Sequence, residues 1–394
     1  MQVDTFGKYT QELENAMWDV VGREYDREYD FAELVAELNS PDFARPFSER
    51  LLVFYNDVSG SSFNASEAAK DLRRRADLKG LSMNRGTVNN WFSGGTEPRY
   101  GGDDRQRLFT MAFALELDVR QTDKLFQKVF LDAAFNKRNI NEFIYLYCIY
   151  NKKPMSVAED LISKTSIINI AAVPADHTVQ TQVLAETAMR DAGKNEIIEY
   201  ILAHPHNFSL NHTAAKKKRV ELLDDLRGDV NQKGLARQEH ERRPELADGK
   251  NKVKTSVDFM LSVLKDADFV QKDSKDIILI REKFPQRKEI YNKFPDKQTL
   301  SEKDPSSYAL RKDIILLYFF WYWVKDFLYR QEHGKERGPG EYDDFVENLR
   351  STLFDCGFSP LYVGNPYDWL FLYCSACSDR SNPLDVFRGI LAPD

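Results

Sequence analysis

Apolar residues recur along most of the chain at the spacing of an amphipathic helix. In Phe31–Leu38 and Glu196–Leu202 they fall at positions i, i+3 and i+4, which places them on one helical face. Alternating patterns bounded by Asn-Gly or Asp-Gly turns, the signature of β-hairpins, are hard to find. The pattern therefore predicts an all-α protein whose helices are joined by short loops rich in Gly, Pro and Asp.

The stretch 83–96, MNRGTVNNWFSGGT, predicts a short helix with a narrow apolar face. Asn84 suits the N-cap, because a short polar side chain accepts hydrogen bonds from the free N–H groups of the first turn. Val88 and Trp91 lie three residues apart on the inward face, with Phe92 beside them. Gly94 and the glycine after it end the helix by adopting positive φ. The outward surface is left to polar side chains: Arg85, Thr87, Asn89 and Asn90.

The preceding segment, Ser66–Leu78, suits a first helix that packs against this one. Its small apolar residues allow close approach, and Arg73, Arg74 and Arg75 fall where they can face phosphates. From residue 66 to residue 99 the chain has seven basic and four acidic side chains, a local balance of +3 in a chain of net charge −7. Two such helices form a helix-turn-helix, whose second helix lies in the major groove of DNA.

Residues 66–126 resemble the Cro/repressor-type (XRE-like) helix-turn-helix domain, a lambda-repressor-like fold of five helices. The resemblance is carried by the small-residue helix, by residues 83–91 with Gly94 and Pro98, and by Leu108–Leu117 before the helix 118–130. The longer pattern resembles large uncharacterised helix-turn-helix proteins of Gram-positive gut bacteria. The family's recognition positions correspond here to Asn84, Arg85, Gly86, Thr87, Asn89 and Asn90. The basic residues Arg73, Arg74 and Arg99 complete the predicted DNA-binding set.

Three features depart from that family. The usual Gln-Ala pair of the first helix is not clear in this sequence. The connection that begins Lys79-Gly-Leu-Ser is longer than usual. Gly86 is predicted in the middle of the reading helix, where glycine costs up to about 1 kcal/mol relative to alanine.

The second half of the chain resembles the first in four blocks that keep their order. Leu131–Cys148 matches Phe354–Cys374, which has three extra residues, and a short acidic amphipathic helix follows each. The block at Arg105 matches that at Arg311, and Arg85–Phe92 matches Arg287–Phe294. The order predicts an internal duplication, with chance similarity between helical segments as the alternative. Lys293 stands where the first copy has Trp91, so a degenerate helix-turn-helix or an ordinary helical hairpin is expected there.

These signals divide the chain into five predicted segments. They are an N-terminal helical segment (1–60), the helix-turn-helix domain (61–130), a helical body (131–227), a charged linker or loop (228–252) and a C-terminal helical domain (253–394). The basic run Lys216–Arg219 is expected to be a solvated helix face.

The longest apolar run, Ile314–Val324, is well short of the roughly 20 residues that cross a bilayer, so a buried core helix is expected. The aromatic clusters Tyr318–Trp323 and Trp369–Tyr373 form either the core of the second half or a dimer contact. The lone CxxC of Cys374 and Cys377 has no second pair, which favours buried thiols in a reducing cytoplasm over a zinc site.

The remaining chemistry-bearing residues do not combine into a catalytic pattern. The Gly-rich loops lack the spacing of a phosphate-binding loop, the histidines at 204, 206 and 212 are irregularly spaced, and no nucleophile, base and acid can be grouped. We therefore expect no enzyme activity, no metal and no cofactor.

The sequence thus predicts a cytoplasmic protein that binds double-stranded DNA sequence-specifically, most simply as a transcriptional regulator. A homodimer fits this function because palindromic operators match two-fold symmetry. The alternative is a helical interaction or scaffold protein that uses the helix-turn-helix fold without reading DNA. The pI of about 5.6 keeps that alternative open, because any DNA contact must come from a local patch.

Overall fold

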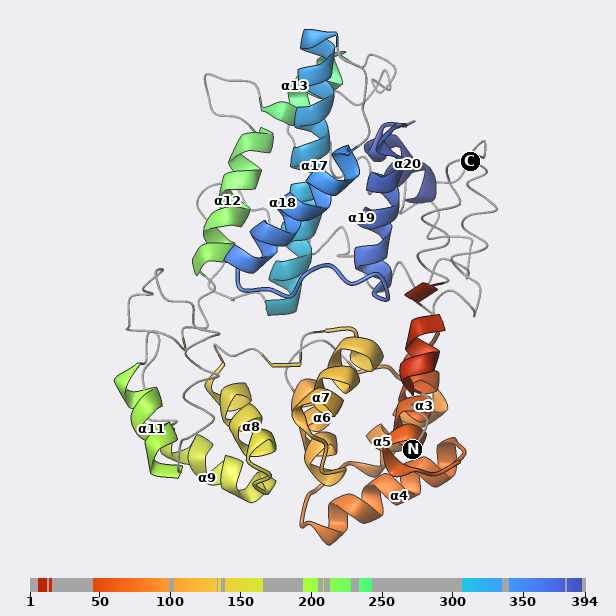
Figure 1. The fold of residues 1–394 in the computed structure, drawn as a ribbon, viewed down its shortest axis with the longest axis vertical. Coiled ribbons are helices and arrows are strands. Elements are labelled where there is room, and N and C mark those ends of the chain that lie inside the picture. Colours follow the sequence, from red (N-terminus) through yellow and green to blue (C-terminus); the bar gives the residue numbers. More distant parts are fainter. Residues whose placement is uncertain are drawn as a thin grey trace. The chain divides into compact units, whose positions relative to one another are not determined.

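The computed structural model describes residues 6–12, 14–15, 45–98, 103–132, 134–135, 139–165, 194–204, 208, 213–227, 234–242, 307–334, 340–379 and 381–391. Every regular element in these ranges is a helix (Figure 1), which confirms the all-α prediction for them. The predicted helix 31–38, the block 287–294 and Arg99 lie outside the described residues.

The chain divides into two compact units. Unit 1 comprises Met1–Thr10 and Arg45–Thr213, and unit 2 comprises Gln11–Ala44 and Ala214–Asp394. The helices described in unit 1 are α3 (Phe47–Ser59), α4 (Ala65–Leu78), α5 (Arg85–Ser93), α6 (Asp103–Ala114), α7 (Val119–Lys124), the π-helix η1 (Leu125–Phe130), α8 (Ile140–Tyr150), α9 (Met155–Thr165) and α11 (Lys194–Ala203).

One hydrophobic core joins these helices from α3 to α11. Phe54 of α3, Leu72 of α4, Phe109 of α6 and Ile144 of α8 are each fully buried in it. The predicted boundaries at 60/61 and 130/131 pass through this core. The physical reason is that α3 and α8 bury their apolar faces in the same core as α4, α5 and α6.

Unit 2 is built around a long central helix. Its described elements are α12 (Thr213–Arg227), α13 (Leu235–Arg242), α17 (Ser307–His333), α18 (Glu341–Asp355), α19 (Pro366–Ala376), the 3-10 helix η6 (Cys377–Asp379) and α20 (Pro383–Leu391). Helix α17 contacts α13, α18, α19 and α20. The apolar run 314–324 lies at its centre and is buried except at Trp321 and Tyr322, which are partly exposed, so the prediction of a core helix is confirmed.

The aromatic clusters form the core of unit 2. Trp323 is fully buried, and its indole N–H donates to Ser375 Oγ at 3.1 Å, while Phe319 and Phe371 meet edge to face at 5.1 Å. Packing within the unit therefore accounts for their burial without a dimer contact. All four cysteines are buried thiols, as predicted. Among the described helices, none has the length and apolar content to cross a membrane.

Two local expectations need correction. Part of the predicted linker 228–252 is helix α13, because Leu235 packs on the unit 2 core and Arg242 Nη1 donates to Leu328 O at 3.4 Å. The basic run 216–219 is not uniformly solvated. Arg219 is only 7% exposed and lies 3.5 Å from Asp313 of α17, since α12 turns this position toward the central helix.

Candidate nucleic-acid interface

Helix α4 is fixed at both ends by its own sequence. Asn64 Oδ1 accepts from the Glu67 backbone N–H at 3.0 Å, and Glu67 Oε2 accepts from the Asn64 N–H at 2.9 Å, a reciprocal capping box. At the other end Gly80 adopts φ +68°, and the Leu81 N–H bonds to Ala76 O at 2.9 Å. The buried stripe between these ends consists of small or aliphatic residues, which lets α5 approach closely: Ala68, Ala69, Leu72 and Ala76.

Helix α5 begins and ends where the sequence predicted. Asn84 is the N-cap, with its Oδ1 accepting from the Thr87 N–H at 3.0 Å, and Gly94 ends the helix at φ +78°. Residues 79–84 connect the two helices. Gly86 therefore lies in the first turn rather than in the middle of the helix, which corrects the sequence-based placement. A Cβ at position 86 would lie 3.2 Å from Asn84 Oδ1, so glycine leaves room for the cap.

The inner face of α5 packs on α3. Val88, Trp91 and Phe92 are buried, as predicted. The Trp91 ring meets Phe47 edge to face at 6.1 Å, and the Phe92 ring meets Tyr55 at 5.4 Å and 89°. The sequence alone did not reveal α3 as this platform, although the Phe and Tyr spacing of its apolar face was a usable signal.

The outer face of α5 is polar. Asn84, Arg85, Gly86, Asn89 and Asn90 are exposed, and Thr87 is partly buried. The oxygen of the Asn84 amide is occupied by the cap, and the Asn90 side chain lies against Gly95. Arg85 and Asn89 have no side-chain partner within the described part of the chain.

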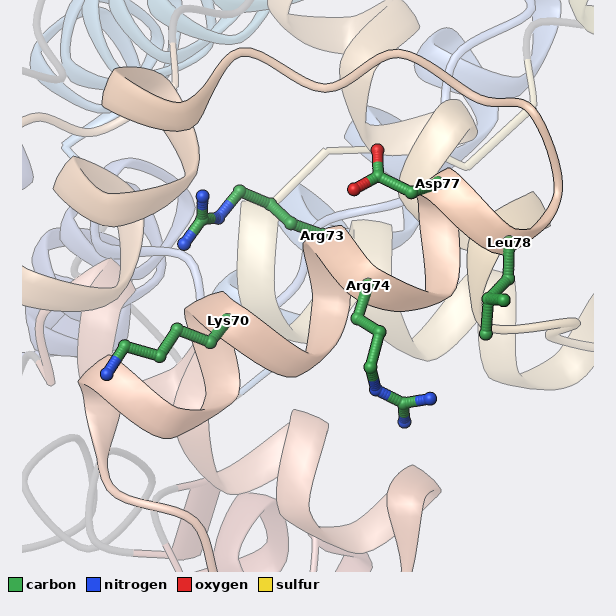
Figure 2. A pocket seen from close by; sticks show the side chains of 5 residues that line it. All are labelled: Lys70, Arg73, Arg74, Asp77 and Leu78. Carbon is green, nitrogen blue, oxygen red and sulfur yellow. The ribbon is translucent and has the colours of Figure 1, made fainter.

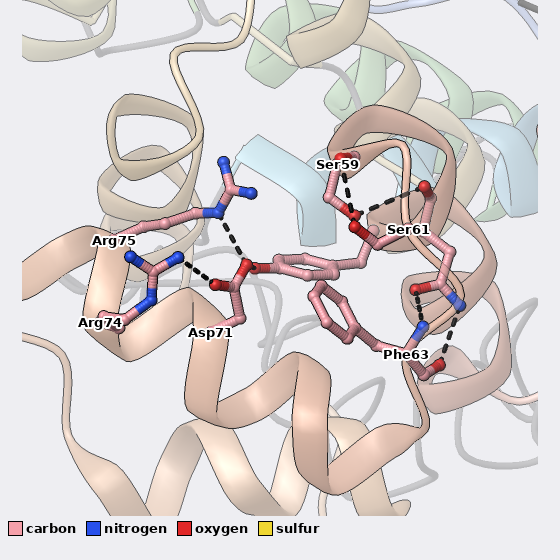
Figure 3. A network of polar contacts seen from close by, with 8 residues as sticks. Ser59, Ser61, Phe63, Asp71, Arg74 and Arg75 are labelled. Atoms are coloured by element: carbon pink, nitrogen blue, oxygen red, sulfur yellow. Dashed lines mark hydrogen bonds and ion pairs between the residues drawn. The ribbon is translucent and has the colours of Figure 1, made fainter.

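The three consecutive arginines of α4 have different surroundings. Asp71 Oδ1 accepts from Arg74 Nη2 at 2.6 Å, and its Oδ2 accepts from Arg75 Nε at 2.7 Å and from the Tyr55 hydroxyl at 2.8 Å (Figure 3). Burial raises the pKa of the Asp71 carboxyl, but the hydrogen bonds from Arg75, Arg74 and Tyr55 outweigh it and lower the pKa to about 2. Asp71 is therefore a charged partner for both arginines at neutral pH.

Arg73 points away from this network. Its Nε donates to the backbone O of Ala69 at 3.2 Å, and no carboxylate within the described ranges pairs with it. Arg73 lines a shallow hollow on the surface of α4 that is largely open to solvent (Figure 2). The whole lining comes from one helix: Lys70, Arg73, Arg74, Asp77 and Leu78.

The local positive balance is thus partly neutralised. Lys79 pairs with Glu116 at 2.7 Å, and this hydrogen bond lowers the pKa of the Glu116 carboxyl. Arg74 and Arg75 pair with Asp71, which leaves Lys70, Arg73 and Arg85 as the cations of α4 and α5 without a carboxylate partner in the described ranges. The predicted set 73, 74, 84–87, 89 and 90 lies on these two neighbouring helices. No protein-family model, curated protein or solved structure matches this chain.

Proposed function

We propose that this protein binds double-stranded DNA sequence-specifically through α4 and α5 and acts as a transcriptional regulator. The observation that carries the proposal is the division of α5 into two faces. Val88, Trp91 and Phe92 are buried against the core, and the opposite face offers amide and guanidinium groups to solvent. A recognition helix requires this division, because one side must be held rigidly while the other enters the major groove.

The side chains of α5 suit base edges rather than phosphates alone. Arginine bonds bidentately to guanine and asparagine to adenine, and each such pair contributes about 1–3 kcal/mol of discrimination. Arg85 and Asn89 are the strongest candidates, since neither is engaged by another described side chain. The proposal needs no cofactor and no catalysis. A homodimer would present two copies of α5 to a palindromic operator.

We also infer that residues 311–391 are a diverged copy of residues 105–165. Arg105 donates to Glu142, and the matching Arg311 donates to Asp368. Both acids lie in the first turn of a helix capped by an asparagine, Asn139 for α8 and Asn365 for α19. The matching aromatic pairs, Phe113 with Tyr145 and Phe319 with Phe371, both meet edge to face. We assign sequence-specific DNA binding to unit 1, because its α5 is held on the core by the buried Trp91.

The test selects DNA fragments from a random pool with the full chain and measures affinity and site preference at two salt concentrations. The double variant Arg85→Ala with Asn89→Ala should lose the preference for the selected site by about 1–3 kcal/mol per lost base contact. The matched control is Arg350→Ala with Asn348→Ala, the same residue types on the exposed face of α18. The proposal is wrong if the α5 variant keeps both affinity and site preference.

A protein-contact function is the second candidate. It is favoured by Leu78, which is 73% exposed at the C-terminal end of α4 and borders the basic hollow. In this case the chain would bind a protein partner stably and would not bind duplex DNA even at low salt. Leu78→Asn would weaken that partner complex, whereas DNA binding by α5 would not depend on it.

A further inference from the structure

Asp71 divides the basic residues of α4 into two groups. Arg74 and Arg75 lie within 2.7 Å of its carboxylate oxygens, and the Tyr55 hydroxyl from α3 holds the same carboxylate in place. Lys70 and Arg73 are outside this network. The side-chain spacing explains the division, because positions three and four residues after Asp71 share its side of the helix, whereas Arg73 does not.

The hollow on α4 is where the second group, Lys70 and Arg73, can bind a ligand. Lys70 and Arg73 line it and bring two cations to one surface, opposed there by the single carboxylate of Asp77. Arg74 also lines it, but its guanidinium is engaged by Asp71. In Figure 2 the guanidinium of Arg73 extends from α4 on the opposite side from that of Arg74, and the Lys70 side chain extends toward the start of the helix. Two cations that pair with no carboxylate in the described part of the chain suit a phosphate oxyanion.

We propose that Lys70 and Arg73 hold the DNA phosphate backbone at this hollow, and that Asp71 keeps Arg74 and Arg75 out of that contact. This inference rests on the proposed function and refines it. The α4 contribution to DNA affinity is then two phosphate contacts rather than four. Asp71 thus limits the number of phosphate contacts that α4 makes. This weakens sequence-independent binding, so that the base contacts of α5 can discriminate between sites.

The salt dependence of binding separates these roles. Each phosphate contact contributes about 0.9 to the slope of log K against log salt for duplex DNA. The probe is a 30-base-pair duplex of arbitrary sequence, so no operator is needed. Lys70→Gln with Arg73→Gln should reduce the slope by about 1.8, and Arg74→Gln should leave it unchanged. Asp71→Asn should tighten binding and steepen the slope by up to about 1.8, since it releases two cations.

Two controls exclude general charge and folding effects. Lys152→Gln with Lys153→Gln removes two exposed positive charges elsewhere in unit 1 and should not change the slope. Tyr55→Phe removes one hydrogen bond to Asp71 but keeps its pairs with both arginines, so the slope should also stay as in the wild type. Helical content measured by circular dichroism confirms that each variant is folded.

The outcomes distinguish this inference from the proposed function. If the wild-type chain binds no duplex even at low salt, the proposed function fails and the inference with it. If the wild type binds but Lys70 and Arg73 can be replaced without changing the slope, only the inference is overturned. It is also overturned if Arg74→Gln lowers the slope by about 0.9, the value of one phosphate contact, because Asp71 would then not restrain Arg74.

Discussion

Arg311 and Asp368 form a buried bidentate pair between α17 and the first turn of α19. The guanidinium Nη1 and Nη2 donate to Oδ1 at 2.9 Å and to Oδ2 at 2.7 Å. Arg311 also donates to the backbone oxygens of Ser359 and Pro360, and Asp368 accepts from the Tyr362 N–H at 2.9 Å. The pair therefore fixes the loop before α19 as well as the helix, and both charges have several partners.

Arg311→Met should destabilise unit 2 by about 3–5 kcal/mol, because Asp368 would stay buried without its counter-charge. The double variant Arg311→Met with Asp368→Leu should cost less than the single variant, since both charges are removed together. Hydrogen exchange of the α19 amides reports the stability of this unit separately from unit 1. Equal exchange rates in the wild type and in Arg311→Met would contradict the prediction.

Arg105→Met should have the matching effect on α8 in unit 1. Arg105 donates to Glu142 Oε1 at 2.6 Å and to Asp132 Oδ2 at 2.8 Å, so its loss removes the guanidinium that both carboxylates share. Arg107→Met is the control on the same helix. Arg107 pairs with Asp104 at the surface, where an ion pair contributes only about 0–1 kcal/mol. The inference of an internal repeat is contradicted if Arg105→Met destabilises α8 no more than Arg107→Met does.

The pH dependence of stability should change in Asp71→Asn. The folded pKa of Asp71 is about 2, below its ordinary value of 3.8, so its ionised form stabilises the fold at pH values above about 4. That contribution is lost as the pH falls from about 4 to about 2. The difference in unfolding free energy between the wild type and Asp71→Asn should therefore shrink over this window. Denaturant titrations from pH 6 to pH 2 measure it, and a constant difference would argue against the paired state of Asp71.

The sequence was sufficient for features that depend on neighbouring residues. Asn84 and Gly94 bound α5 because a cap and a positive φ need only local chemistry. The spacing also permits Arg74 and Arg75 to pair with Asp71, which precedes them by three and four residues, although we predicted from the sequence that both arginines face phosphates. The ion pair of Lys79 could not be predicted in this way, because its partner Glu116 follows α6 and is close to Lys79 only in the folded chain.

Burial of charged residues was the harder part of the prediction. Arg219 reads as part of a solvated basic run, and only the packing of α12 on α17 shows that it is buried. The π-helix 125–130 and the role of α3 likewise depend on a core assembled from distant segments. The positions of α4 and α5 in the sequence were therefore predictable, whereas the burial and pairing of charges whose partners lie far along the chain were not.

Gly94→Ala should destabilise α5 by about 1 kcal/mol or more, because alanine disfavours the positive φ of this helix end. The new Cβ would also lie 3.2 Å from Ser48 Oγ, which adds a close contact with α3. Gly80→Ala is the matched control, since Gly80 has φ +68° and an added Cβ there would meet no atom within 4 Å in the described part of the chain. Hydrogen exchange should show a larger loss of protection in α5 for Gly94→Ala than in α4 for Gly80→Ala, and an equal loss would mean that Ser48 moves aside.

Substitutions of Asn84 separate capping from DNA contact. Asn84→Ala removes the oxygen that accepts from the Thr87 N–H and should destabilise α5 by about 1 kcal/mol. Asn84→Asp keeps an oxygen at the cap, and a negative charge there favours the helix N-terminus, so α5 should remain as stable as in the wild type. The added charge would still repel DNA phosphates if this end of α5 enters the groove. We therefore expect both variants to bind DNA more weakly and only the alanine variant to lose stability. Asn139→Asp, the same change at the N-cap of α8, should alter neither property. Wild-type affinity in Asn84→Asp would place the first turn of α5 away from the DNA.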